Sequence, residues 1–177
     1  GSDDGLIHLT KDGGTSWACI SKTLPQNLWV SRVQFSTHDP SRIYATLNGY
    51  RWDDFTPYVY ISEDLGASWR NISANLPKSS VNVIREDATH EQLLYVGTDN
   101  GLYVGVDKGA DWYLFDENIP RVAVHDLFIQ KEENDLLVGT HGRSIYLLEL
   151  EAVQQYPEIV KQPFVIIQPK AQQHNKR

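Results

Sequence analysis

Several residue types are scarce in this sequence, and each scarcity excludes a class of protein. The 177 residues include one cysteine and no methionine, so an internal disulfide and a cysteine metal cluster are both excluded. Lys and Arg number 16 against 23 Asp and Glu, a formal net charge of −7. Without a basic run, a protein that binds a nucleic-acid backbone is not expected. No apolar stretch approaches the roughly 18 residues of a membrane-spanning helix, so no membrane span is expected.

Several well-known motifs for cofactors and catalysis are also lacking. The sequence has no glycine-rich phosphate loop, no G-x-S-x-G nucleophile segment and no H-E-x-x-H pair. Its Asp-rich turns do not have the regular ligand spacing of a calcium loop. We therefore predict no cofactor and no metal. The five Trp and nine Tyr instead favour an all-β protein with aromatic packing.

Three segments of the chain share the pattern Ser/Thr-x-Asp-x-Gly-x-x-Trp, and we call them the Asp–Gly–Trp segments. They cover residues 10–17, 62–69 and 105–112, and the third has Gly105 at its first position. Their spacing matches one four-stranded propeller blade of about 40–50 residues. The sequence therefore predicts an incomplete β-propeller.

Each position that the three segments share has a structural reason. The aspartate can accept hydrogen bonds from turn N–H groups, the glycine can adopt a positive φ, and the tryptophan starts the next strand with a large ring to pack. We predict structural roles for Asp12, Gly14, Trp17, Asp64, Gly66, Trp69, Asp107, Gly109 and Trp112.

Alternating apolar residues and turn signals between these segments divide the chain into about three and a half blades. We expect a half blade over 1–25, blades over 30–76, 81–119 and 122–169, and a polar tail over 170–177. The last blade has no Asp–Gly–Trp segment. A short helix over 151–160 and a strand over Phe164–Gln168 are expected there instead. The longest loop is predicted over 48–57.

The three segments resemble the Asp-box (BNR) repeat of sialidases and sortilin-type propellers. Leu94–Tyr103 and Leu137–Tyr146 resemble the large bacterial sortilin/Vps10-like proteins often named as glycosyl hydrolases, and the resemblance extends from residue 1 to about 169. Because a propeller typically has 4–8 blades, the count of about three and a half blades leads us to expect that this chain is the C-terminal part of a longer propeller. Its partners would be the remaining blades, from the parent chain or another chain. The resemblance also implies an extracytoplasmic location (periplasmic, cell-surface or secreted) and a site opposite the Asp-box turns.

On that opposite face the sequence places aromatic, basic and acidic residues together. The ligand-binding candidates are Tyr50, Arg51, Trp52, Asp99, Asn100, His141 and Arg143, and the links between blades add Trp29, Arg32, Arg121 and His125. Such a group of residues suits either a sugar ring or a peptide. For His141 and Arg143, hydrogen bonding in a tight turn is favoured over catalysis. His125-Asp126 predicts a hydrogen bond that lines the channel.

Asp53 and Asp54 are the candidates for an acid and a base, although neighbouring side chains on an extended segment point apart. Three functions fit the sequence. A scaffold that binds a protein, a peptide or a glycan is favoured. A glycoside hydrolase of sialidase or xyloglucanase kind, with its other active-site residues in further blades, is the alternative. A structural assembly module is the third. The Arg-Ile-Pro segment of sialidases is absent, since Ile119-Pro120-Arg121 has a different order.

Overall fold

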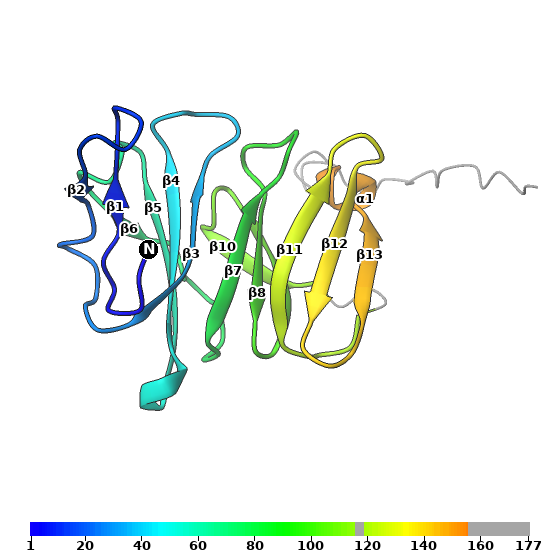
Figure 1. The fold of residues 1–177 in the computed structure, drawn as a ribbon. Coiled ribbons are helices and arrows are strands. Elements are labelled where there is room, and N and C mark those ends of the chain that lie inside the picture. Colours follow the sequence, from blue (N-terminus) through cyan, green and yellow to red (C-terminus); the bar gives the residue numbers. More distant parts are fainter. Residues whose placement is uncertain (116–118, 156–177) are drawn as a thin grey trace, which may run out of the picture.

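The computed structural model describes residues 1–115 and 119–155, which form four antiparallel sheets (Figure 1). The first sheet holds β1 (His8–Leu9) and β2 (Ala18–Cys19). The second holds β3 (Trp29–Phe35), β4 (Ile43–Gly49), β5 (Asp54–Ser62) and β6 (Arg70–Asn71). The third holds β7 (Val81–Glu86), β8 (Leu94–Thr98), β9 (Gly101–Val106) and β10 (Asp111–Leu114). The fourth holds β11 (Val124–Gln130), β12 (Asp135–Thr140) and β13 (Ile145–Glu149).

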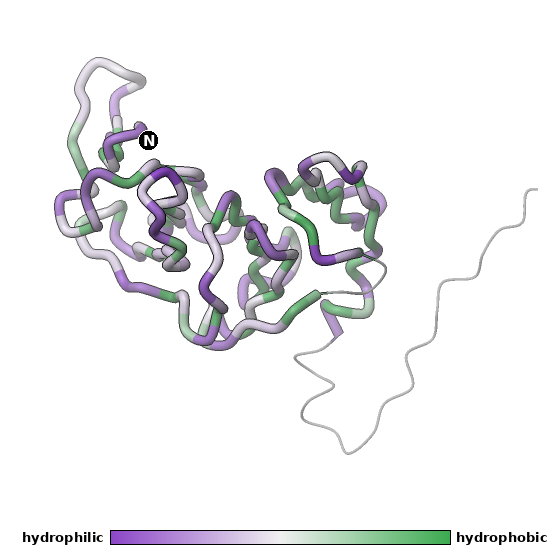
Figure 2. The backbone as a smooth tube through the Cα atoms, turned by 90° about the horizontal axis from the view of Figure 1, so that it is seen from below, coloured by the Kyte–Doolittle hydropathy of each residue, from purple (hydrophilic) through white to green (hydrophobic). Residues whose placement is uncertain are grey.

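The sheets follow one another in sequence order, and in the second, third and fourth sheets the first strand lies beside the first strand of the neighbouring sheet. Strand β7 contacts both β3 and β11, and these three inner strands lie toward the viewer in Figure 1. Seen from below in Figure 2, the chain passes from sheet to sheet, with the first and fourth at opposite ends. This is the radial arrangement of propeller blades.

The hydrophobic core consists of three layers, one between each pair of neighbouring sheets. Strand β4 shows why, because all of its residues are buried. Ala45 and Leu47 pack toward the first sheet, whereas Tyr44 packs into the layer shared with the third sheet. Alternate side chains of one strand thus fill two different layers, and a strand in the middle of the molecule carries apolar residues on both faces.

A buried carboxylate joins the second and third sheets. Glu86, at the end of β7, accepts hydrogen bonds from the Tyr44 hydroxyl at 2.8 Å, the Ser36 hydroxyl and the Thr37 N–H. Arg42 lies 3.3 Å away and supplies the counter-charge. These donors lower the pKa of Glu86 although burial alone would raise it. The ion therefore stays charged inside the protein and connects two blades.

The first two Asp–Gly–Trp segments form the same turn. In the second, the Ser68 N–H and the Ser68 hydroxyl donate to the Asp64 carboxylate at 2.8 and 2.6 Å, and the Gly66 N–H donates to the Ser62 hydroxyl. Asp12 makes the equivalent bonds with Ser16 and Thr10. The third segment has Gly105 and Asp111 in place of the two hydroxyl residues. There the Gly109 N–H bonds to the carbonyl of Val106 instead.

The prediction of an all-β fold with one short helix near the C-terminus is confirmed: α1 spans Glu151–Gln154. The expected loop over 48–57 is wrong. Gly49 still pairs with Asp54 across the hairpin, and only a single 3₁₀ turn, η1 (Tyr50–Trp52), and Asp53 in the left-handed region separate the two strands.

Some expectations concern residues beyond the described part of the chain. The helix past residue 155, the strand over Phe164–Gln168 and the tail over 170–177 lie outside the described residues. The blade boundaries stay predictions for the same reason, since 116–118 are also not described. Within the described residues, no helix combines the length and the apolar character needed to cross a membrane.

Candidate functional site

A cavity of about 420 Å³ opens at the end of the sheets opposite the Asp–Gly–Trp turns. This is the lower end in Figure 1, where the β4–β5 and β8–β9 turns meet the links between sheets. The cavity draws residues from the second, third and fourth sheets. Its lining consists of Trp29, Asn48, Tyr50, Arg51, Asn82, Asp99, Ala123, His125 and His141.

An irregularity in each inner strand turns side chains toward this end. The pairing register shifts between Val30 and Arg32, between Val81 and Val83, and between Val124 and Asp126. The extra residues are Ser31, Asn82 and His125, and the last two line the cavity. A β-bulge re-aims a side chain in this way and is common next to functional sites.

The polar floor of the cavity is a connected series of side chains. Asn48 Nδ2 donates to Asn82 Oδ1 at 2.9 Å. Asn82 Nδ2 in turn donates to Asp99 Oδ1 at 2.8 Å and to the backbone carbonyl of Val124. The Tyr50 N–H in turn donates to Asn48 Oδ1. Because Asn82 bonds to Asn48 of the second sheet, to Asp99 of its own sheet and to the Val124 carbonyl of the fourth, the floor is fixed before any ligand arrives.

The walls of the cavity are aromatic and basic. Trp29 is 41% exposed and Tyr50 60% exposed, which is unusual for large apolar rings. The Arg51 guanidinium carbon lies 5.4 Å from the centre of the Trp29 ring, in cation–π geometry. The rings of His125 and His141 meet edge to face at 5.1 Å. The site thus offers flat apolar surfaces beside hydrogen-bond donors.

A charged cluster lies next to the cavity on the inner strands. Asp126 Oδ1 is 2.5 Å from Arg32 Nη2 and 3.7 Å from Arg85 Nη2, and Arg85 Nη1 also donates to Gln34 Oε1. Burial, and then the charge of Arg32, lower the pKa of Arg85. Asp126 is thus held between two arginines, whereas its neighbour His125 lines the cavity. Arg32, which we expected near the site, is occupied by this ion pair instead.

Four of the seven predicted ligand-binding residues come together in the cavity: Tyr50, Arg51, Asp99 and His141. Trp52, Asn100 and Arg143 are exposed and are not part of its lining. The lining also includes Asn48, Asn82 and Ala123, which were not among the predicted residues. No motif marks these residues, because the bulge at Asn82 and the contact of Asn48 with another sheet arise only on folding.

The two acid–base candidates lie outside the cavity lining. The Asp54 carboxylate accepts hydrogen bonds from the Thr56 N–H at 2.9 Å and the Tyr58 hydroxyl at 2.7 Å. These bonds lower the pKa of Asp54, so it would hold a proton poorly near neutral pH. Its neighbour Asp53 is exposed, with a φ of 56°.

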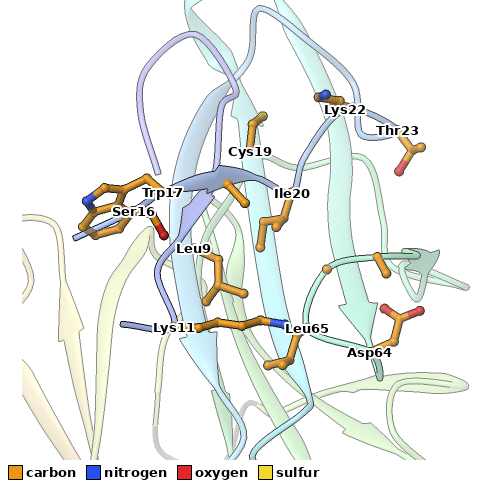
Figure 3. Close-up of a pocket in the computed structure, with 13 residues that line it drawn as sticks. Leu9, Lys11, Ser16, Trp17, Cys19, Ile20, Lys22, Thr23, Asp64 and Leu65 are labelled. Carbon is orange, nitrogen blue, oxygen red and sulfur yellow. The ribbon is translucent and has the colours of Figure 1, made fainter. Parts of the chain in front are cut away.

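A second groove, of about 560 Å³, lies at the opposite end of the molecule, along β2 and the second Asp–Gly–Trp turn (Figure 3). Its lining includes Lys11, Trp17, Cys19, Ile20 and Leu65. Neither opening has the ligands of a metal centre, since no group of three or more His, Cys, Asp or Glu gathers anywhere in residues 1–115 and 119–155.

Comparison with solved structures identifies the fold. A GH74 xyloglucanase from Xanthomonas campestris superposes with a TM-score of 0.63 at 19% identity, over 83% of this chain and 24% of that one. A GH74 enzyme from Niastella koreensis gives 0.65 at 15% identity, over 84% and 25%. YCF48, solved bound to a D1 peptide, gives 0.56 at 18% identity, over 86% and 51%.

These neighbours are β-propeller proteins, and the chain has their fold. It spans about a quarter of the length of the GH74 proteins. No protein-family model matches the sequence, and no curated protein matches it either.

Proposed function

We propose that this chain is part of an Asp-box β-propeller that binds a peptide at the cavity between its second, third and fourth sheets. The observation that carries the proposal is the combination of exposed aromatic walls with a fixed polar floor. Trp29 and Tyr50 present their rings to solvent, while Asn82 is held by partners on both sides. Exposed aromatic residues beside an arginine are typical of protein-binding surfaces.

The turn geometry supports the Asp-box part of the proposal. Asp12 and Asp64 accept from the same two kinds of neighbour, a hydroxyl two residues before and a serine four residues after. The resemblance to sortilin-type propellers carries with it the expectation of an exported protein, which we include in the proposal. YCF48 offers a precedent for a propeller bound to a peptide.

A glycoside hydrolase is the second candidate, favoured by the likeness to GH74 proteins. Such enzymes use two carboxyl groups, about 5–9.5 Å apart, on either side of the sugar bond. Among the described residues, the cavity lining includes one carboxylate, Asp99, and its Oδ1 is already bound by Asn82. The cavity therefore lacks, among its described lining residues, the second carboxyl group that hydrolysis needs, and this favours binding over hydrolysis.

The test is a peptide-array screen of the 177-residue chain, followed by fluorescence anisotropy with the strongest peptide. Tyr50→Ala and Trp29→Ala should each weaken binding about ten-fold or more, the usual effect of removing an aromatic anchor. Trp52→Ala is the matched control. It removes an equally exposed ring from the same hairpin but outside the cavity, and it should leave the affinity unchanged.

Hydrolysis is tested in parallel with xyloglucan and a chromogenic sialoside. Release of reducing sugar or dye that is abolished by Asp99→Asn would overturn the proposal in favour of the hydrolase. Equal losses of peptide binding for Trp52→Ala and Tyr50→Ala would place the ligand elsewhere on the hairpin. Absence of binding to any array peptide would contradict the peptide proposal.

A further inference from the structure

The two interior Asp–Gly–Trp segments dock on the preceding sheet through the same hydrogen bond. Trp69 Nε1 donates to the carbonyl oxygen of Ile20 at 2.7 Å, and Trp112 Nε1 donates to the carbonyl oxygen of Ile72 at 2.7 Å. Each acceptor follows the tryptophan of its own segment by three residues. A sheet of this kind therefore offers an indole on one flank and an isoleucine carbonyl on the other.

The glycine of each segment completes the same contact. A Cβ added to Gly66 would lie 2.6 Å from Ile20 Cδ1, and one added to Gly109 would lie 3.1 Å from Ile72 Cδ1. The absence of a side chain therefore lets the isoleucine approach the turn closely. Trp112 is 3% exposed in this contact. The indole, the glycine and the isoleucine form one repeated joint between sheets.

The first Asp–Gly–Trp segment has the same tryptophan and glycine, but its indole does not donate to the carbonyl of an isoleucine on another sheet. Trp17 is 61% exposed, and its Nε1 turns back to the Gly14 carbonyl at 3.2 Å. The nearest atom to a Cβ at Gly14 would be the Trp17 ring itself, 4.0 Å away. In Figure 3 the Trp17 ring lies at the opposite end of β2 from Ile20 and points away from Leu65. The turn is nonetheless fully formed, because Asp12 holds it.

We propose that Trp17 and Gly14 form a docking surface for the outer strand of another Asp–Gly–Trp sheet, one that precedes this sheet in the same polypeptide. The occupant would carry the sequence Trp-x-x-Ile and would offer the isoleucine carbonyl to the Trp17 indole. The direction follows from the two interior joints, since in each the tryptophan contacts the sheet before it.

A second copy of the described chain does not offer such a strand. The Ile20 and Ile72 carbonyls already accept from Trp69 and Trp112. The equivalent position of the third sheet is Phe115, which packs into the core layer shared with the fourth sheet. The repeat therefore points to a further sheet as the occupant, not to self-association.

The chain itself supplies a probe. Gly1-Ser-Asp-Asp-Gly-Leu6 corresponds to Gly97-Thr-Asp-Asn-Gly-Leu102, so a copy of residues 29–96 placed directly before Gly1 keeps the register of the repeat. The copy adds one complete sheet with its own Ile72, and it adds two inner strands beside β1. Oxidation of each tryptophan by N-bromosuccinimide, followed by mass spectrometry of peptides, then reports the exposure of Trp17.

In the extended chain, oxidation of Trp17 should slow at least ten-fold relative to the 177-residue chain, whereas oxidation of Trp52 should not change. Ile72→Asp in the copied segment should restore the reactivity of Trp17, and Ile72→Val there should not. Three results would each overturn the proposal: a Trp17 that is equally reactive in both chains, rapid proteolysis of the added segment, or protection of Trp17 in the 177-residue chain that rises with protein concentration.

Discussion

At the scale of single residues, the turn aspartates show how one carboxylate can organise a hairpin. Asp64 accepts from the hydroxyls of Ser62 and Ser68 and from a backbone N–H. These bonds, led by that of the Ser68 hydroxyl, lower the pKa of Asp64 from its ordinary 3.8 to about 2. All of the donors favour the charged form, so the turn depends on ionisation even though it lies at the surface.

The lowered pKa makes a prediction about acid stability. A carboxyl group whose pKa is lower in the folded state stabilises the fold above its unfolded pKa and loses this contribution as pH falls through the folded value. Asp64→Asn should therefore unfold at lower urea concentration than the wild type at pH 7, and the difference should shrink between about pH 4 and pH 2. Urea midpoints measured across this range check the prediction.

The control for that experiment is Asp107→Asn. The third Asp–Gly–Trp segment has neither serine partner, so the substitution should leave the pH profile close to that of the wild type. A constant difference between wild type and Asp64→Asn from pH 7 to pH 2 would show that the charge of Asp64 does not stabilise the turn.

At the scale of elements, the joints between sheets are what hold the molecule together. The same pattern places a tryptophan at the start of each outer strand, yet Trp112 is buried and Trp17 is exposed. The difference lies in the neighbouring sheet and not in the local sequence. One motif therefore makes unequal contributions to stability, according to what lies beside it.

Replacing the two tryptophans by alanine should show this inequality. Trp112→Ala removes a buried ring and the hydrogen bond to Ile72 and should lower the free energy of unfolding by about 3–5 kcal/mol. Trp17→Ala should change it by no more than about 0.5 kcal/mol in the 177-residue chain. Equilibrium denaturation by urea, followed by circular dichroism, measures both. Equal losses would mean that the exposed ring is packed in solution.

The inner strands show what sequence patterns miss at this scale. Alternation of apolar residues predicted the strands of the second and third sheets, because side chains on opposite faces enter opposite core layers. The bulges at Ser31, Asn82 and His125 carry no such signal. A bulge is defined only by the pairing of a strand with its neighbouring strand. The sequence of β7 alone therefore could not predict that the Asn82 side chain lines the cavity.

At the scale of the whole molecule, the four sheets form a series in which neighbouring sheets share a core layer. In such an array, local stability depends on the number of neighbours a sheet has. The middle strands β4 and β8 are buried throughout, whereas β1 and β2 each have two residues and partly exposed side chains. The ends of the series should therefore open before its middle.

Hydrogen–deuterium exchange followed by mass spectrometry tests this order. The amides of β1 and β2 should exchange first, and those of β4 and β8 should exchange last, because regions with few buried contacts open at low free energy. The peptide that covers η1 gives an internal reference for an exposed turn. Exchange in β8 as fast as in β1 would contradict a series of nearest-neighbour joints.

Local sequence patterns predicted the strands of the blades and the turns between them. These depend on local physics: the period of a strand, the positive φ of a glycine, and the hydrogen bonds of an aspartate within its own turn. Which of the polar residues meet depends instead on the packing of the sheets. The series Asn48–Asn82–Asp99 joins two sheets, and its geometry depends on how the sheets pack, which no local pattern encodes.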